Sequence, residues 1–185
     1  MAVCEAITTS YLESSQNSIT FSSIPSTYEH LQIRASLRDS GTGNYSAVKM
    51  WFATGGGSHD TGTNYTFHQI YGYGSTIKSE MSTNYNHARA YGLAANDTSP
   101  WVKNPVFLTC NILLIDYANT SKNTTWEHNG YSHVSHDYTN YETFASFGGG
   151  MWNNTGAVDK IVFGCEGAPY LRGSTITLYG IKAAN

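Results

Sequence analysis

Two histidines and an aspartate in one polar stretch are the residues of this chain that most resemble a metal-ligand set. His133, His136 and Asp137 could offer imidazole nitrogens and a carboxylate oxygen, which are common zinc ligands. A metal site needs a complete set of ligands, and this loop has no defined partner set. We therefore interpret the three as solvated loop side chains, and we predict no metal and no cofactor.

A second polar stretch, His59-Asp60, follows the glycines at 55–57. An acid–base pair is one interpretation, but Asp beside glycines is typical of turns, and we favour turn chemistry. Neither this glycine run nor the one at 148–150 has the Lys-Ser/Thr ending of a phosphate-binding loop. The 13 Asp and Glu residues include no recognisable glycosidase pair, although pairs distant in sequence stay open. Since no serine lies in a nucleophile-elbow context either, we predict no catalytic residue and no enzyme activity.

The abundance of Tyr is the remaining sequence feature that bears on function. Of the 185 residues 14 are Tyr, and many of them gather in two regions. Tyr joins an apolar ring to a hydroxyl group, so it suits subunit contacts and sugar stacking alike. Positions in the core and rim of an antiparallel sheet are the alternative explanation. The candidate contact residues are Tyr71, Tyr73, Tyr138 and Tyr141.

The overall composition favours an all-β protein with an uncharged polar surface. Charged residues make up 12% of the chain and aromatic residues 14%, while Ser, Thr and Asn crowd the segments between apolar runs. The formal charge of −3 and the lack of a basic run argue against nucleic acid as a partner. No apolar run approaches the ~20 residues that span a bilayer, and the first residues lack the pattern of a signal peptide.

The three cysteines are widely separated, at Cys4, Cys110 and Cys165. This spacing matches neither a disulfide framework nor a zinc motif. All three lie in or beside apolar strand patterns, so we expect buried thiols.

The last strand, at residues 173–182, organises the predicted fold. Ile176 and Leu178 alternate with Ser and Thr, which is the period of a half-buried strand. Because a strand this apolar would invite aggregation at an open sheet edge, we predict an interior strand that closes the fold. An ordinary edge strand is the alternative. The cleanest alternation elsewhere is at residues 31–38, where Leu31 begins the apolar face.

Most of the remaining chain also shows strand patterns. Strands are predicted at residues 4–12, 17–21, 45–53, 65–73, 88–94, 105–117, 125–133, 143–152 and 158–164. The run 105–117 is the most apolar and is predicted to be covered on both faces. Residues 74–83 predict a loop or one short helical turn, and the glycines at 148–150 predict a bulge or a close backbone approach.

About ten strands at regular spacing, with no repeated motif, are typical of a sandwich or barrel. We predict a single domain over residues 1–185, an antiparallel β-sandwich of jelly-roll type. Its core should contain Leu31, Ile33, Leu37, Ile112, Leu114, Ile161, Phe163, Ile176 and Leu178.

Three stretches of the chain resemble parts of a family of small β-rich virion proteins of tailed bacteriophages, of the capsid-decoration and fibre-tip type. They are ITFSSIPSTYEHLQIR at 19–34, IDYANTSK at 115–122 and GSTITLYGI at 173–181, and TNYTFHQI at 63–70 is also similar. The resemblance spans nearly the whole chain. Its motifs are turns and strands, so it implies architecture and setting rather than a mechanism.

The resemblance implies a non-enzymatic structural protein of the phage particle. In that family the module can end a longer fibre protein, but here the first predicted strand begins at about Cys4 and leaves no room for a shaft. This favours a self-contained capsid decoration or cement protein on the particle exterior, made in the host cytoplasm. Expected partners are the major capsid protein or a tail component and further copies of the chain, with a trimer implied by the family.

The alternative function is a tail-fibre or spike receptor-binding module that contacts host surface glycan through Tyr-rich loops. A glycan binder should gather several aromatic side chains in one exposed concave patch. A cement protein should instead present a broad and flatter apolar surface to other subunits.

Overall fold

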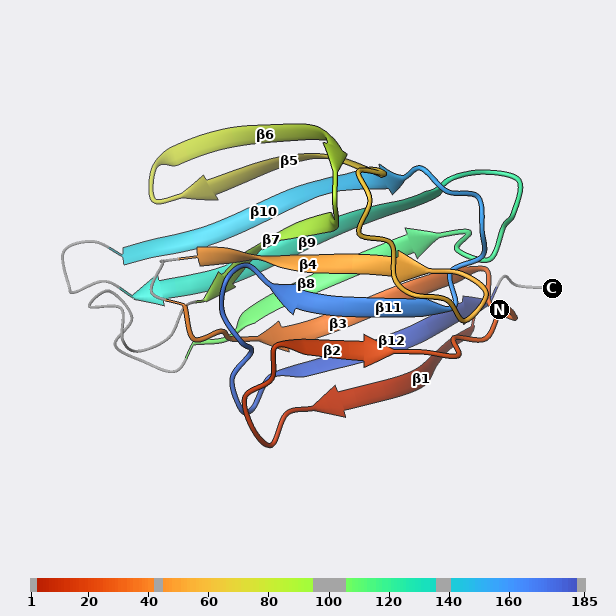
Figure 1. The fold of residues 1–185 in the computed structure, drawn as a ribbon. Helices are drawn as coiled ribbons and strands as arrows, with labels where there is room; N and C mark the ends of the chain where they lie inside the picture. The colour runs from red at the N-terminus through yellow and green to blue at the C-terminus, as the bar shows by residue number, and fades with distance from the viewer. Residues whose placement is uncertain (1–2, 42–44, 95–105, 136–140, 183–185) are drawn as a thin grey trace.

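The chain folds as two antiparallel β-sheets packed against each other, as the computed structural model shows (Figure 1). The structure describes residues 3–41, 45–94, 106–135 and 141–182, and the regular elements among them are all strands. Within this described part of the chain, no helix has the length and hydrophobicity needed to cross a lipid bilayer. The all-β sandwich predicted from the sequence is confirmed, while the jelly-roll connectivity stays a prediction.

The two sheets differ in size. The large sheet has eight strands, in the spatial order β1 (Val3–Tyr11), β12 (Thr175–Lys182), β3 (His30–Leu37), β8 (Leu108–Ile115), β9 (Thr124–Ser135), β10 (Tyr141–Trp152), β5 (Tyr65–Tyr73) and β6 (Thr76–Tyr85). The small sheet has four strands, in the order β2 (Ser18–Phe21), β11 (Lys160–Cys165), β4 (Tyr45–Ala53) and β7 (Ala88–Ala94). The β5–β6 hairpin extends the large sheet beyond the small one (Figure 1).

Strict alternation in sequence positions the core between the sheets. Along β3, β8 and β12 every second side chain is buried, because successive side chains of a strand point to opposite faces. All nine predicted core residues are buried, none of them more than 1% exposed. An aromatic cluster continues the core, with Phe52, Tyr65 and Trp152 at ring-centroid distances of 5.6 to 6.2 Å.

The last strand is interior, as predicted, and the edge-strand alternative is wrong. β12 lies between β1 and β3, so the two ends of the chain are paired side by side in the large sheet (Figure 1). Leu178 is opposite Ile33 on one side and Thr8 on the other, and its side chain is fully buried.

Two expectations about the strands are wrong. Gly74 and Ser75 form a turn, but residues 76–83 belong to β6 rather than to a loop or helical turn, because they pair in register with β5. β8 is covered on one face only: Leu108 and Leu114 are buried, whereas Thr109 and Asn111 are exposed on the opposite face.

For the glycines at 148–150 the sequence predicted either a bulge or a close backbone approach. The structure shows the close approach. β10 keeps an unbroken register with β5 and β9 through these residues, so there is no bulge. A Cβ atom on Gly148 would lie 2.5 Å from Cβ of Gln69, and one on Gly150 would lie 2.4 Å from the ring of Trp126. Larger residues would push β5 and Trp126 away.

One buried histidine is held neutral by the core. His128 on β9 is 2% exposed, and neither of its ring nitrogens has a hydrogen-bond partner among the described residues. Burial lowers the pKa of His128 to about 4, because the charged imidazolium would lose its hydration.

Replacing a buried apolar residue of β12 by a charge should abolish folding. Leu178→Asp should yield mostly insoluble protein, because burial of this side chain contributes roughly 1.5–3 kcal/mol against a total stability of about 5–15 kcal/mol. The matched control is Thr177→Asp, whose side chain lies on the opposite face of the same strand. Soluble yield and thermal unfolding measure the effect, and unchanged melting of Leu178→Asp would show that the strand is peripheral.

The free energy of unfolding should fall as the pH is lowered from about 6.5 to about 4. In that window the unfolded chain protonates His128 and the folded protein does not, so acid favours unfolding by up to about 3 kcal/mol. Urea unfolding at pH 7 and pH 4.5 should show a smaller loss for His128→Leu than for the wild type. His68→Gln, at an exposed position, is the control and should keep the wild-type loss. An identical loss in His128→Leu would contradict the assignment.

Candidate docking surface

The large sheet has one face packed on the small sheet and one face turned away from it, which we call the outer face. Side chains reach the outer face from every second position of each strand, and the strand registers place them in rows across the sheet. One such row contains Arg34, Asn111 and Asn129 on β3, β8 and β9, and Phe147 and Ile70 continue it on β10 and β5.

The half of the outer face over β12, β3 and β8 is mainly polar, with Leu113, Ile115 and Ile181 partly buried among polar side chains that contact one another. Asn111 donates from Nδ2 to Oδ1 of Asn129 at 3.3 Å. The guanidinium carbon of Arg34 lies 5.2 Å from the ring centre of Tyr179, and Nη2 of Arg34 donates to Oε1 of Gln32 at 3.4 Å. These side chains form hydrogen bonds and a cation–π contact with one another in the isolated protein.

The other half, over β9, β10, β5 and β6, carries large exposed apolar side chains among polar neighbours such as Glu127, Asn129 and His68. We call its five exposed large side chains the apolar patch: Ile70, Ile77, Met81, Tyr131 and Phe147, which are 51%, 80%, 70%, 51% and 64% exposed. They are contiguous, because Phe147 is opposite Ile70, and Ile70 is opposite Ser79 midway between Ile77 and Met81. Tyr131 lies on β9 diagonally across from Phe147.

Phe147 stands between two shallow hollows of the outer face. One hollow, of about 280 Å³, is lined by His68, Ile70 and Glu127, and by Gly148 and Gly149, which have no side chains to fill it. The other, of about 130 Å³, lies toward β3 and is lined by Gln32, Leu113 and Asn129 among others. A partner could therefore pack on the exposed ring of Phe147 and insert side chains into the hollow on either side of it.

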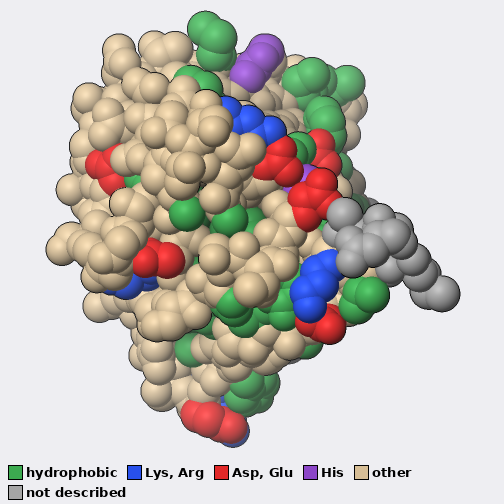
Figure 2. All heavy atoms as spheres, turned by 90° about the vertical axis from the view of Figure 1, so that its right-hand side faces the viewer, with side chains coloured by type: hydrophobic (Ala, Val, Ile, Leu, Met, Phe, Trp, Pro, Cys, Tyr) green, Lys and Arg blue, Asp and Glu red, His purple; other side chains and the backbone are tan. Residues whose placement is uncertain are grey.

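Charge is scarce on this surface. Among the described side chains that β3, β8, β9 and β10 present to the outer face, Arg34 is the only Lys or Arg and Glu127 the only Asp or Glu. Figure 2 shows a similar scarcity at one end of the sandwich, where uncharged polar side chains and backbone dominate and charged side chains are scattered. Interface cores share this depletion of charge.

The Tyr residues predicted as a contact surface lie at one end of β5 and β10. Tyr71 is half-buried and stacks on Phe144, with ring centroids 5.6 Å apart and an angle of 19° between the planes. Tyr73 is opposite Phe144 in the register, and Tyr141 begins β10, but their side chains are outside the described part of the structure. Tyr138 also lies outside it.

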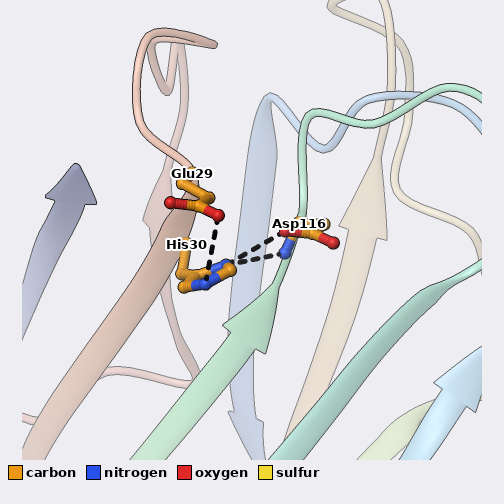
Figure 3. A group of neighbouring side chains, drawn as sticks. All are labelled: Glu29, His30 and Asp116. Carbon is orange, nitrogen blue, oxygen red and sulfur yellow. Dashed lines mark hydrogen bonds and ion pairs between the residues drawn. The ribbon is translucent and has the colours of Figure 1, made fainter. Parts of the chain in front are cut away.

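The loop predicted for His133, His136 and Asp137 is wrong for His133, because β9 continues through this residue. His133 lies in β9 opposite Thr143, whereas His136 and Asp137 are outside the described residues. A different group, Glu29, His30 and Asp116, brings possible ligand atoms within 4.8 Å of one another where β3 begins and β8 ends (Figure 3).

That group is bonded to the protein rather than arranged around an empty position. Nδ1 of His30 accepts a hydrogen bond of 3.0 Å from the backbone N–H of Asp116, so its lone pair is used. Lys122 donates to the carboxylate of Asp116, and this bond is the main cause that lowers the pKa of Asp116. The contacts join two strand ends.

His59-Asp60 forms the turn that the sequence predicted. The carboxylate of Asp60 accepts hydrogen bonds from Nε1 of Trp152 at 2.7 Å, Nδ2 of Asn64 at 2.8 Å and the backbone N–H of Gly62 at 2.8 Å. Burial works to raise the pKa of Asp60, but these three donors lower it below the usual value. Asp60 therefore anchors its loop to the core.

The expectation of buried thiols is right for Cys110, right in part for Cys165 and wrong for Cys4. Cys110 is buried and Cys165 is mostly covered, but Cys4 is exposed, because β1 is an edge strand with little packed on it. Sγ of Cys165 lies 3.0 Å from the carboxylate of Asp39 and 3.3 Å from Oγ of Ser46. Burial, together with the Asp39 carboxylate, raises the pKa of Cys165 to about 12, so this cluster does not form a reactive thiolate.

Sequence reasoning missed the residues of the apolar patch. The alternation from Ile77 to Met81 was visible, but two apolar residues in a polar segment gave no sign of a buried face. Phe147 follows the strand period of β10 and was noted only as part of that strand. Their exposure depends on which face the small sheet covers, which a single strand does not encode.

Comparisons with known proteins add no family assignment. No family model, no curated protein and no solved structure matches this chain. The resemblance to phage virion proteins therefore stays a prediction, and functional inference starts from the geometry of the outer face.

Thiol reactivity should separate the three cysteines. In the native protein Cys4 should react quickly with an aromatic disulfide reagent, whereas Cys110 and Cys165 should not, because burial raises the pKa of both thiols to about 12. Absorbance of the released thiolate should report one thiol per native chain and three after denaturation. Cys4→Ser should reduce the native signal to zero, and fast native labelling of this variant would contradict the described burial.

Proposed function

We propose that this protein is a non-enzymatic structural protein on the exterior of a phage particle, and that the outer face of its large sheet docks on other virion subunits. A capsid decoration or cement role is the form of this function that we favour. The observation that carries the proposal is the apolar patch on a sheet face that no other described element covers.

The apolar patch supports a protein partner because its exposure is costly in an isolated protein. Contiguous exposed apolar surface marks interaction sites, whereas singly scattered apolar residues are normal. Ile77 and Phe147 project from a regular sheet, so no local turn geometry requires them to be apolar. Burying each of them against a partner would contribute roughly 1.5–3 kcal/mol.

The glycan-binding alternative has less support. It calls for several aromatic side chains in one exposed concave patch, but Tyr71 stacks on buried Phe144, and Tyr179 lies half-buried beneath Arg34. The hollow nearest to an exposed aromatic ring is lined by Ile70 and glycines as well as by Glu127 and His68. That lining suits an inserted apolar side chain better than a sugar.

The scarcity of charge gives the proposed docking a distinctive salt response. A complex formed through Lys and Arg contacts weakens steeply with salt, because ions screen exposed charges beyond about 10 Å at 0.1 M. Burial of apolar area is not weakened in this way. Docking through the apolar patch should therefore survive high salt in large part.

The test is co-sedimentation of purified protein with phage particles that lack it. The wild type should bind at 0.1 M and at 1 M NaCl, and Phe147→Asp should weaken binding about 30-fold, since losing a central apolar side chain of an interface costs about 2 kcal/mol or more. Thr20→Asp, which places the same charge on exposed β2 of the small sheet, is the matched control and should bind normally. Equal binding by Phe147→Asp and the wild type would contradict the proposal.

A further inference from the structure

The strand β6 is an open edge of the large sheet, and it is unusual among the edges of this molecule. It has ten residues, and no described strand pairs with its outer side. Its register with β5 is regular from Thr76 to Ser82, and the one irregularity lies at the far end, toward Tyr85. An open edge presents a row of backbone N–H and C=O groups that are ready to pair with another strand.

Two other edges carry features that discourage such pairing. β1, at the opposite edge of the large sheet, has a register shift between Ala6 and Thr8. β2, at an edge of the small sheet, has only four residues. Irregularity and shortness are the usual means by which proteins protect sheet edges. The regular part of β6 has neither, and it exposes Ile77 and Met81 more than any other large apolar residues described.

We propose that β6 pairs antiparallel with β6 of a second copy of this chain, about a two-fold axis that passes beside Ser79. This inference goes beyond the proposed docking function and does not depend on it. The sequence around Ser79 is self-complementary in this register: Ile77 of one copy faces the partner's Met81, Lys78 faces the partner's Glu80, and Ser79 faces the partner's Ser79.

In this register the facing side chains of the two copies would be complementary on both faces of the paired strands. On the outer face, Ile77 and the partner's Met81 would contact each other twice, once on each side of the axis. Directly opposite residues of antiparallel strands have Cβ atoms about 4.5–5.5 Å apart, close enough to cover these side chains. They are 80% and 70% exposed in the single chain, so pairing would remove much apolar surface from water.

On the inner face the same register pairs opposite charges. Glu80 is already held in place, because Nη1 of Arg89 donates to its carboxylate at 2.7 Å and Nε2 of Gln69 donates at 3.0 Å. Its side chain is still 32% exposed, and Lys78 is exposed two residues away on the same face. A Lys on an edge strand normally opposes pairing. In this register it would lie opposite the partner's Glu80, whereas a register shifted by one pair of residues would place Lys78 opposite Lys78 or Glu80 opposite Glu80.

Pairing would also join the apolar patches of the two copies. Ile70 and Phe147 lie on the two strands behind β6, on the same face as Ile77 and Met81. The paired sheets would run continuously through β10, β5 and β6 of both copies. Two outer faces would then form one larger surface about the two-fold axis.

The first test is the mass of the full chain in solution, by sedimentation equilibrium over a range of concentrations. The wild type should be a dimer that dissociates on dilution, and Ile77→Lys should raise the dissociation constant by about tenfold or more, because the substitution enters the interface twice. Phe147→Asp is the matched control: it places a charge on the same face, two strands from the edge, and should leave the dimer intact.

The second test fixes the register with a disulfide, in a Cys4→Ser background that removes the exposed thiol. Ser79→Cys should form a covalent dimer on mild oxidation, because the two Cα atoms would fall within the roughly 4.4–6.8 Å that a disulfide spans. Ile77→Cys should not, since its copies would be displaced by four residues, about 13 Å along the strands.

The proposal would be overturned by a monomer at every concentration, by an oligomer that Ile77→Lys leaves unchanged, or by equal cross-linking through residues 77 and 79. A trimer, which the family resemblance implies, would also contradict it, because antiparallel edge pairing closes with two copies. Failure to dock on particles would contradict only the proposed function. The dimer would still be supported if Ile77→Lys weakened it and Phe147→Asp left it intact.

Discussion

One-sided coverage of the large sheet is the constraint on which the rest of this structure depends. A β-strand that sends one side chain inward sends the next one outward, and the four-stranded sheet covers only the inner face of an eight-stranded one. The outer face must therefore be acceptable to water or covered by something else. Over β12, β3 and β8 it is mainly polar, with Thr, Gln, Asn and Arg side chains, and its apolar residues Leu113 and Ile115 are partly buried. Over β10, β5 and β6 it contains Phe147, Ile70, Ile77 and Met81, whose apolar side chains are exposed to water at a cost in free energy.

The same constraint explains why the polar clusters of this molecule are structural. Asp60, Asp116 and the Asp39–Cys165 contact all join strand ends or loops to the sandwich: the Asp60 carboxylate accepts a hydrogen bond from Trp152, that of Asp116 accepts from Lys122, and that of Asp39 accepts from the thiol of Cys165. Chemistry needs polar atoms that are held in place but left available. Among the described residues the apolar patch is exposed instead, which is why the proposed function is association with other subunits.

The sequence predicts the inner half of this molecule well and the outer half poorly. Alternation at Leu31 and Ile33, and again at Ile176 and Leu178, identifies buried rows because core formation selects those residues directly. Ile77 and Met81 follow the same period, but no described part of this chain covers them, so their segment did not resemble a half-buried strand. For the run at 105–117 the error was the opposite one. Coverage on both faces was predicted, but Leu113 and Ile115 are apolar without being buried. Which side of a strand meets a partner depends on the whole assembly and not on local pattern.

The central claim is that the outer face of the large sheet is the surface by which this protein meets other subunits. A density map of an intact phage particle that carries the protein tests this most directly, because it shows which face points at a neighbour. The account predicts that Phe147 and Ile70 lie against another protein subunit while the small sheet faces solvent. A map in which the outer face is open to solvent, and the contact runs through the small sheet or the strand ends, would contradict it.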